Sequence, residues 1–224
     1  MSNQNIPKKI LHWYDNNKRN LPWRKRASKK NKEFYTLVSE FMLQQTQVKT
    51  VIPFFNNFIS KIPNLKSLAN VKEEKLMKCW EGLGYYSRAT NLKKTAIKIL
   101  KEFKGKLPSS IDQLKSLPGV GDYTSRAIMA IAFNKKIIPI DGNVERILKR
   151  VFYLRKENEM TKEYLNSKKY FFGISDRGSD YAQAIMEIGA LVCKPNNPLC
   201  VKCPISFNCI SFKKSDFELK AKNK

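Results

Sequence analysis

Residues 112–127 read DQLKSLPGVGDYTSRA, a stretch in which two short helical segments flank a turn rich in proline and glycine. The turn contains Pro118, Gly119, Val120 and Gly121. Glycine lets a backbone approach a phosphate closely, and the first N–H groups of the following helix point toward that anion. Such an element fixes the position of a nucleic-acid backbone without reading its sequence. We therefore predict a DNA-binding helix-hairpin-helix here.

Helical periodicity extends over almost the whole chain, because apolar residues recur at intervals of three and four. Short breaks containing Pro, Gly or Asn separate the periodic stretches, with neither an internal repeat nor a low-complexity linker between them. This pattern predicts an all-α fold, with no parallel sheet. The expected helices lie near residues 5–18, 32–47, 49–61, 72–80, 85–103, 110–116, 122–134, 142–153, 161–172 and 178–193.

The 224-residue chain carries 43 lysines and arginines against 19 acidic residues, a formal net charge of +24. An AT-rich coding sequence, which favours lysine codons, accounts for part of this excess. The basic residues are nevertheless spread along the chain, which favours a folded surface that binds a polyanion. Hydrophobic residues make up 42% and charged residues 28%, which excludes a disordered chain. No apolar run is long enough to span a bilayer, and the N-terminus lacks signal-peptide features. We expect a soluble, intracellular protein with no membrane partner.

Four of the five cysteines lie close together in the sequence, in the pattern C-x6-C-x2-C-x5-C formed by Cys193, Cys200, Cys203 and Cys209. An intracellular protein does not normally use such a group for disulfides. Four thiolates suit either an iron–sulfur cluster or a structural zinc ion, and only the middle pair has the short spacing typical of zinc sites. The spacing therefore favours a [4Fe–4S] cluster over zinc. Cys79 lies alone in an apolar stretch and is expected to be a buried small side chain.

Three further motifs accompany the hairpin and the cysteines: VSEFMLQQTQV at 38–48, WEGLGYYSRATNL at 80–92 and IDGNVERIL at 140–148. Together with the hairpin and the cysteine spacing, they resemble the endonuclease III superfamily of DNA glycosylases, and within it the MutY adenine DNA glycosylases. The resemblance covers nearly the whole chain. It implies a two-lobed, all-α helix-hairpin-helix glycosylase fold with a C-terminal iron–sulfur cluster loop. The expected lobes are a six-helix domain at 26–135 and a cluster domain formed by 1–25 and 136–212, followed by a basic tail at 213–224.

The family resemblance implies hydrolysis of the N-glycosidic bond of adenine mispaired with 8-oxoguanine or guanine in double-stranded DNA, leaving an abasic site. Glu40 lies in an apolar helical stretch where desolvation is expected to raise its pKa, and it matches the family's general acid. A purely structural role as a helix N-cap is one interpretation of Asp141. The family resemblance instead matches it to the carboxylate that stabilises the sugar cation. Tyr123 stands where strand-cleaving relatives have a lysine nucleophile, which implies a monofunctional enzyme. Asn143 is expected to steady the same centre.

Other residues match family positions that contact DNA or the extruded base. Gln45 and Tyr85 match residues that probe the duplex around the oxidised guanine, where an aromatic ring can stack in an opened base step. Lys194 and Lys202 lie in the cysteine loop, which is expected to bind backbone phosphate and to serve a structural role. The adenine-pocket positions are Arg19, Trp23, Arg24 and Gln183; a structural salt bridge is an equal alternative for Arg19.

Typical relatives continue into a second domain that recognises 8-oxoguanine, whereas this chain ends 15 residues after Cys209. We therefore expect adenine removal with a diminished preference for the oxidised base. Two alternatives remain: a short thymine mismatch glycosylase of the same superfamily, and a non-catalytic iron–sulfur DNA-binding protein. The expected setting is a monomer acting at the nucleoid in bacterial cytoplasm.

Overall fold

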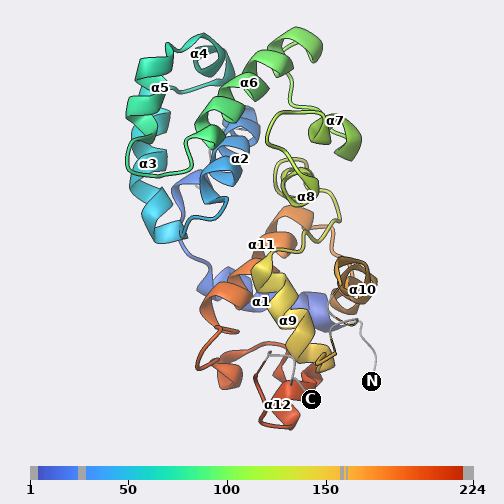
Figure 1. Cartoon of the computed structure of the whole chain (residues 1–224). Helices are drawn as coiled ribbons and strands as arrows, with labels where there is room; N and C mark the ends of the chain where they lie inside the picture. The colour runs from blue at the N-terminus through green and yellow to red at the C-terminus, as the bar shows by residue number, and fades with distance from the viewer. Residues whose placement is uncertain (1–4, 25–28, 157–158, 160, 219–224) are drawn as a thin grey trace. The chain divides into compact units, whose positions relative to one another are not determined.

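The computed structural model describes residues 5–24, 29–156, 159 and 161–218 (Figure 1). All regular structure in these ranges is helical, which confirms the all-α prediction. None of the helices described is both long and apolar enough to cross a membrane. The chain forms two compact units, one made of Met1–Arg19 with Asn134–Lys224 and the other of Asn20–Phe133.

The Asn20–Phe133 unit is built around α2, which contacts α3, α6 and α8 (Figure 1). The central position of α2 follows from its sequence, because most residues from Phe34 to Met42 are apolar and nearly all of them are buried. The elements of this unit are a 3₁₀ turn at Pro22–Arg24, α2 (Lys29–Leu43), α3 (Val48–Lys61), α4 (Leu65–Asn70), α5 (Glu73–Trp80), α6 (Ser87–Glu102), α7 (Ile111–Lys115) and α8 (Asp122–Ile131).

Two features of this unit differ from the sequence prediction. The described part of it contains seven α-helices instead of six, because α4 forms where only a break was expected. Asn64 starts α4 with a capping box, in which its side chain accepts from Ser67 N and its own backbone N–H donates to the Ser67 hydroxyl. The second difference is that α2 ends at Leu43, not at 47, since the backbone becomes left-handed at Gln45 (φ 56°).

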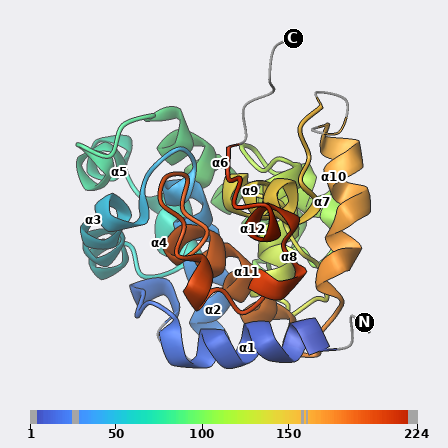
Figure 2. The same cartoon turned by 90° about the horizontal axis from the view of Figure 1, so that it is seen from below.

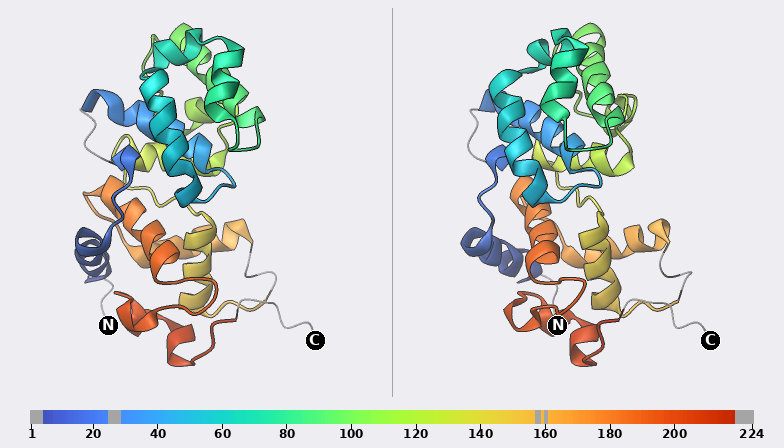
Figure 3. Two further views of the ribbon diagram at one scale, coloured as in Figure 1. Left: turned by 90° about the vertical axis from the view of Figure 1, so that its left-hand side faces the viewer. Right: turned by 60° about the vertical axis from the view of Figure 1, so that its left-hand side comes forward.

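The second unit packs α1 (Ile6–Asn17) and α9 (Gly142–Phe152) against α11 (Gly178–Leu191). Figure 2 shows α1 beside α11, and both views of Figure 3 show α9 and α11 side by side. Their shared core contains buried side chains from each helix, including Ile10, Leu148 and Ile188. The remaining elements are α10 (Lys162–Lys168), α12 (Ile210–Lys213) and 3₁₀ turns at Lys169–Phe172, Cys200–Lys202 and Ser206–Asn208.

Two sequence predictions for this unit need correction. The helix expected at 161–172 is α-helical only to Lys168 and continues as the 3₁₀ turn Lys169–Phe172, which Gly173 ends at φ 69°. A short helix, α12, was not expected after the last cysteine. Part of the predicted basic tail lies outside the described residues from 219 onward, as does the predicted domain start at 26.

The hairpin forms as predicted between α7 and α8. Side chains from outside the hairpin donate hydrogen bonds to its turn. Three backbone oxygens of the turn accept hydrogen bonds: Pro118 O from Thr95 (2.8 Å), Gly119 O from Gln44 (3.2 Å) and Ser116 O from Lys98 (2.9 Å). Gly121 is the N-cap of α8 and offers no side chain to accept from the first amides of that helix. Those amides therefore remain suited to bind an external anion.

Gly119 is required by both its conformation and its surroundings. Its φ is +77°, and an added Cβ would lie 2.9 Å from the ring of Phe41 and 3.0 Å from the Cβ of Asn91. The hairpin turn can pack this closely against α2 and α6 only because residue 119 has no side chain.

We predict that Gly119→Ala lowers the free energy of unfolding by about 2–4 kcal/mol, because it combines left-handed strain with overpacking. Urea denaturation measures this loss. Gly121→Ala is the matched control, since Gly121 has φ −88° and no atom within 4 Å of an added Cβ. Equal losses for the two variants would contradict this account of the turn.

Candidate functional site

Glu40 lies near the C-terminal end of α2, in the unit that also contains the hairpin. It is a carboxyl group in an otherwise apolar stretch: the side chain is only 6% exposed, and its neighbours Ser39 and Phe41 are buried as well. Burying a carboxyl group is unfavourable for its charged form.

Asp141 lies in the other unit and is the N-cap of α9. Its Oδ1 accepts from the backbone N–H of Val144 at 2.8 Å, and its Oδ2 accepts from the Nδ2 of Asn143 at 2.9 Å. Asp141 therefore does act as a helix N-cap, the structural role considered for it from the sequence. Each carboxylate oxygen has a further lone pair, so capping leaves the group able to interact with a cation.

Hydrogen bonds connect Asp141 to the cysteine loop through two side chains. Asn143 donates to Asp141 and accepts from the Nη2 of Arg146 at 2.8 Å. The guanidinium of Arg146 also donates to Gly189 O and Cys193 O, both at 2.7 Å. This contact between α9 and α11 requires a glycine at 189, because an added Cβ would lie 2.5 Å from the Cβ of Asn143. Arg146 was not among the residues predicted from the sequence, although it belongs to the IDGNVERIL motif.

Gln45 and Tyr85 occupy two exposed loops of the hairpin unit, after α2 and before α6. Both residues have left-handed backbones, with φ 56° at Gln45 and 48° at Tyr85. The Tyr85 side chain is 60% exposed, and that of Tyr86 is 46% exposed. A non-glycine residue in this conformation is uncommon and requires support from its surroundings.

The four predicted adenine-pocket residues are divided between the units. Trp23 makes an edge-to-face contact with Phe55 at 5.3 Å, and Arg24 ends the adjoining 3₁₀ turn. In the other unit, Gln183 is 7% exposed and donates to Ser179 O one turn earlier in α11. The fourth residue, Arg19, also reaches α11.

Arg19 binds Glu187, which lies one helical turn after Gln183. The Nε and Nη2 atoms of Arg19 both contact the carboxylate, at 2.7–3.1 Å. The Glu187 side chain is 1% exposed, so the Arg19 guanidinium binds a carboxylate that is almost fully removed from solvent. Sequence reasoning missed Glu187, although a single acidic residue in the apolar run AIMEIGAL is a recognisable signal.

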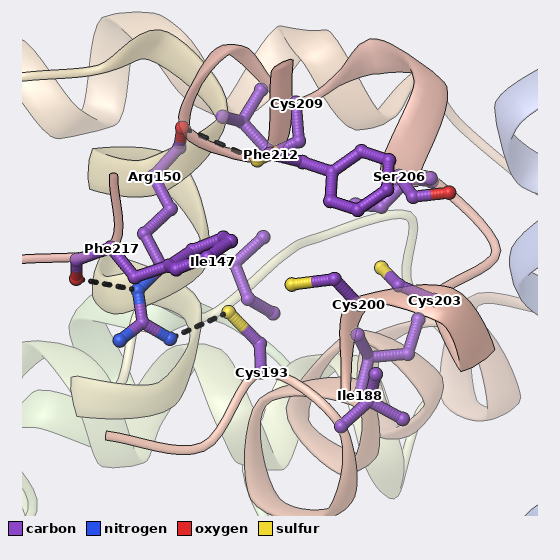
Figure 4. A pocket seen from close by; sticks show the side chains of 13 residues that line it. Ile147, Arg150, Ile188, Cys193, Cys200, Cys203, Ser206, Cys209, Phe212 and Phe217 are labelled. Atoms are coloured by element: carbon purple, nitrogen blue, oxygen red, sulfur yellow. Dashed lines mark hydrogen bonds between the residues drawn. The ribbon is translucent and has the colours of Figure 1, made fainter. Parts of the chain in front are cut away.

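The four clustered cysteines all line one cavity. Figure 4 shows their sulfur atoms directed toward a common space, from the end of α11 and the loop that follows it. The other lining residues are mostly apolar and come from α9, α11 and the C-terminal segment: Ile147, Val151, Ile188, Val192, Ile205, Phe212 and Phe217. Within the described residues, no three His, Cys, Asp or Glu side chains are arranged to hold a single metal ion.

Burial favours the protonated form of three of these thiols, those of Cys200, Cys203 and Cys209. It raises the pKa of Cys203 to about 12 and also raises the pKa values of Cys200 and Cys209. Backbone amides of Ile205 and Phe212 oppose this rise at Cys203 and Cys209 by donating to sulfur. The thiolate forms therefore require a positive charge within the cavity, as a metal centre provides.

Arg150 supplies a buried positive charge at the edge of this cavity, and sequence reasoning missed it. Its guanidinium is 3.4 Å from the Cys193 sulfur and donates to Lys194 O at 2.6 Å and Pro195 O at 2.7 Å. The residue as a whole is only 3% exposed. Arg150 thus both shapes the cysteine loop and favours a negatively charged group inside it. Figure 4 shows its contacts with Cys193 and Phe217.

The sequence matches the family described as "HhH-GPD superfamily base excision DNA repair protein" over residues 38–169. The matched segment includes Glu40, the hairpin and Asp141, and it makes up more than half of the chain. The chain belongs to this family.

Among curated proteins, the chain is similar to adenine DNA glycosylases. The chain is 41% identical to "Adenine DNA glycosylase" of Buchnera aphidicola subsp. Schizaphis graminum, covering 96% of this chain and 62% of the relative. It is also 41% identical to "Adenine DNA glycosylase" of Homo sapiens, covering 89% of this chain and 38% of the relative. The chain therefore spans less than two thirds of either protein's length.

Solved structures agree with the HhH-GPD fold. A thermostable thymine-DNA glycosylase superposes with a TM-score of 0.80 at 26% identity, covering 95% of this chain and 97% of that one. An endonuclease III in a non-covalent DNA complex gives a TM-score of 0.72 at 22% identity, covering 96% and 98%. At that identity, the second match supports the fold alone.

The ion pair between Arg19 and Glu187 leads to a stability prediction. Arg19→Met should lower the free energy of unfolding by about 3–5 kcal/mol, because it removes the guanidinium that binds a buried carboxylate. Arg177→Met is the matched control: Arg177 binds Asp15 and Asp180, but all three side chains are more than 40% exposed, so its loss should cost about 0–1 kcal/mol. Urea denaturation of both variants measures the difference. Losses of similar size would contradict a structural role for the Arg19 pair.

Proposed function

We propose that this chain is the catalytic part of a monofunctional DNA glycosylase that releases adenine mispaired with 8-oxoguanine or guanine. The observation that carries the proposal is a pair of carboxyl groups in unlike environments. Glu40 is buried in the largely apolar second half of α2, while Asp141 is held by an amide and by Asn143 at a helix N-terminus. Similarity to adenine DNA glycosylases supports the choice of substrate.

The two carboxyl groups suit opposite tasks in breaking an N-glycosidic bond. The base leaves as an anion and the sugar becomes an oxocarbenium-like cation, so the enzyme must protonate one and stabilise the other. Desolvation favours the neutral acid, which fits Glu40 as the proton donor to adenine. The N-terminal end of α9 favours a negative charge, which fits Asp141 as the anion near the sugar.

Known magnitudes show how much of the rate these groups can supply. A carboxylate about 4 Å from a cation at an effective dielectric of 20 contributes about 4 kcal/mol. General acid catalysis contributes about 10²- to 10⁴-fold in rate. Together they reach the lower end of enzymatic barrier reductions of about 8–23 kcal/mol. Extrusion and holding of the base must supply the rest.

The remaining predicted residues take supporting roles in this proposal. Tyr123, in the first turn of α8, has no amine and so cannot form a Schiff base with the sugar. Its hydroxyl is proposed to orient Asp141 or the reaction intermediate. The hairpin amides and the lysines of the cysteine loop, Lys194 and Lys202, are proposed to bind the phosphates of double-stranded DNA. Arg19, Trp23, Arg24 and Gln183 are proposed to surround the extruded adenine.

The cysteine cavity fits a [4Fe–4S] cluster held by Cys193, Cys200, Cys203 and Cys209. In such a cluster each cysteine binds a different iron, so four thiolates stand farther apart than the ligands of one zinc ion. The apolar lining and the adjacent Arg150 suit a buried, negatively charged cluster. The cluster would supply folding energy and a rigid loop, because breaking an N-glycosidic bond involves no redox change.

An assay of base release from defined duplexes would also distinguish two other functions. A thymine mismatch glycosylase is favoured by the structural match to a thermostable thymine-DNA glycosylase. It would release thymine from T:G duplexes and leave A:G duplexes intact. A non-catalytic DNA-binding protein would bind all of these duplexes and release no base.

Base release from defined duplexes tests the proposal. The unchanged chain should release adenine opposite 8-oxoguanine and opposite guanine in single-turnover assays. Glu40→Gln should slow release by about 10²-fold or more, because it removes the general acid. Asp141→Asn should slow release by about 10³-fold, which corresponds to losing about 4 kcal/mol.

The matched control is Glu145→Gln, which alters a carboxylate of α9 that pairs with Lys149 and has a side chain 39% exposed. It should leave the rate unchanged. Borohydride should trap no covalent adduct between the chain and DNA, because position 123 has no amine. Release of thymine alone, or full activity of Asp141→Asn, would refute the proposed reaction.

A second prediction concerns the cluster. The purified chain should contain iron and acid-labile sulfide in equal amounts, and Cys203→Ser should lower both and destabilise its unit. Cys79→Ser is the matched control, since Cys79 is buried in the other unit and should not affect iron content. Elemental analysis and thermal unfolding measure these effects. Zinc without sulfide would instead identify the single-metal alternative.

A further inference from the structure

Arg88 binds the two exposed loops that carry Gln45 and Tyr85. It lies in the first turn of α6 and is only 6% exposed. Its Nε, Nη1 and Nη2 atoms donate to six backbone oxygens, three from each loop region: Phe41 O (3.3 Å), Met42 O (2.7 Å), Gln44 O, Leu83 O (3.3 Å), Gly84 O (3.0 Å) and Tyr85 O (3.4 Å). All of these atoms belong to one unit.

The position of Arg88 explains where α2 ends. The last carbonyls of a helix lack partners within the helix and carry partial negative charge. Arg88 satisfies those of Phe41 and Met42 and then holds Gln44 O, just before the left-handed residue Gln45. A positive group is favourable at this helix end, where burial lowers the pKa of the Arg88 guanidinium without removing its charge.

The Arg88 guanidinium also contacts two aromatic rings at the loop that carries Tyr85. It lies 5.3 Å from the ring of Tyr85 and 5.6 Å from the ring of Trp80. Trp80 in turn donates from its Nε1 to Gly84 O at 3.1 Å. The exposed Tyr85 ring therefore rests on a fixed cation, and its left-handed backbone is held by hydrogen bonds on both sides.

A lysine could not replace these contacts. A guanidinium offers five N–H donors in a planar fork, while an ammonium offers three around one nitrogen. The six oxygens around Arg88 belong to two separate backbone segments, so only a fork can hold both at once. The contacts of the Arg88 guanidinium described above are to carbonyl oxygens and aromatic rings, which distinguishes Arg88 from the exposed ion pairs elsewhere in the molecule.

We infer that Arg88 is a positioning residue that sets Gln45 and Tyr85 as a preformed pair for entry into the base stack. This inference rests on the proposed function, in which the two residues probe the duplex. Arg88 would act before bond cleavage, at the step that opens the DNA. Its loss should therefore slow reaction on paired DNA much more than on DNA that is already open.

The first test measures the loops in the free protein. In Arg88→Lys, backbone amides of residues 44–46 and 82–86 should exchange with deuterium about tenfold faster or more, because fewer carbonyl contacts hold them. Amides of α3 should keep their exchange rates. Arg177→Lys is the control, with the same substitution in the other unit. This readout does not depend on catalysis.

The second test compares two duplexes in single-turnover assays: adenine opposite 8-oxoguanine, and adenine opposite a tetrahydrofuran abasic analogue. Arg88→Lys should lose about 10²-fold in rate on the first, the typical effect of a small misplacement, and less than about threefold on the second. Arg177→Lys should match the unchanged chain on both. If Arg88→Lys gives no folded protein, Arg88→Gln retains a planar group with two N–H donors and takes its place.

The two tests distinguish a failure of the role inferred for Arg88 from a failure of the proposed function. Equal rate losses on both duplexes, or unchanged amide exchange in the loops, would overturn the role of Arg88. If the unchanged chain releases adenine from neither duplex, the proposed function fails, while the exchange measurement still decides whether Arg88 holds the loops.

Discussion

The four hydrogen bonds of Arg146 are the constraint on which the second unit depends. They join the start of α9, at Gly142 O and Asn143, to the end of α11, at Gly189 O and Cys193 O. Through Asn143 they also fix the orientation of the Asp141 carboxylate. The N-terminus of α9 and the start of the cysteine loop thus share one continuous set of hydrogen bonds.

The structural role of Asp141 as the N-cap of α9 is compatible with the chemical role proposed for it. Capping α9 uses one lone pair on Oδ1, and the contact with Asn143 uses one on Oδ2. These contacts fix the rotamer of the carboxylate, and the helix dipole stabilises its charge. The N-cap interpretation and the catalytic interpretation are thus compatible, since the cap supplies the preorganisation that electrostatic catalysis requires.

The sequence predicted those parts of the fold that depend on neighbouring residues. The bounds of α1, α3 and α5 agree with the apolar periodicity to within about a residue, and the hairpin follows from LPGVG. The six-residue α4 was missed because its length is too short for a periodic pattern. The early end of α2 could not be predicted, because it depends on Arg88, 46 residues beyond Met42 in the chain.

The candidate site was predictable as a set of residues but not as a set of contacts. Glu40, Asp141 and the cysteines belong to recognisable motifs, whereas the partners that hold them do not. Glu187 lies 168 residues from Arg19, and Arg150 lies 43 residues from Cys193. Side-chain pairing over such separations is set by tertiary packing, about which local patterns carry no information.

Only nine of the 43 basic residues in this chain are arginines. Six of them, namely Arg19, Arg88, Arg146, Arg150, Arg155 and Arg177, each donate to at least two acceptor atoms of the protein. A guanidinium can bind several acceptors at once, whereas an ammonium acts as a solvated point charge. Arg88, Arg146 and Arg150 each join separate backbone segments in this way. An unsolved lysine-rich relative could thus be searched for its tertiary junctions by locating its arginines.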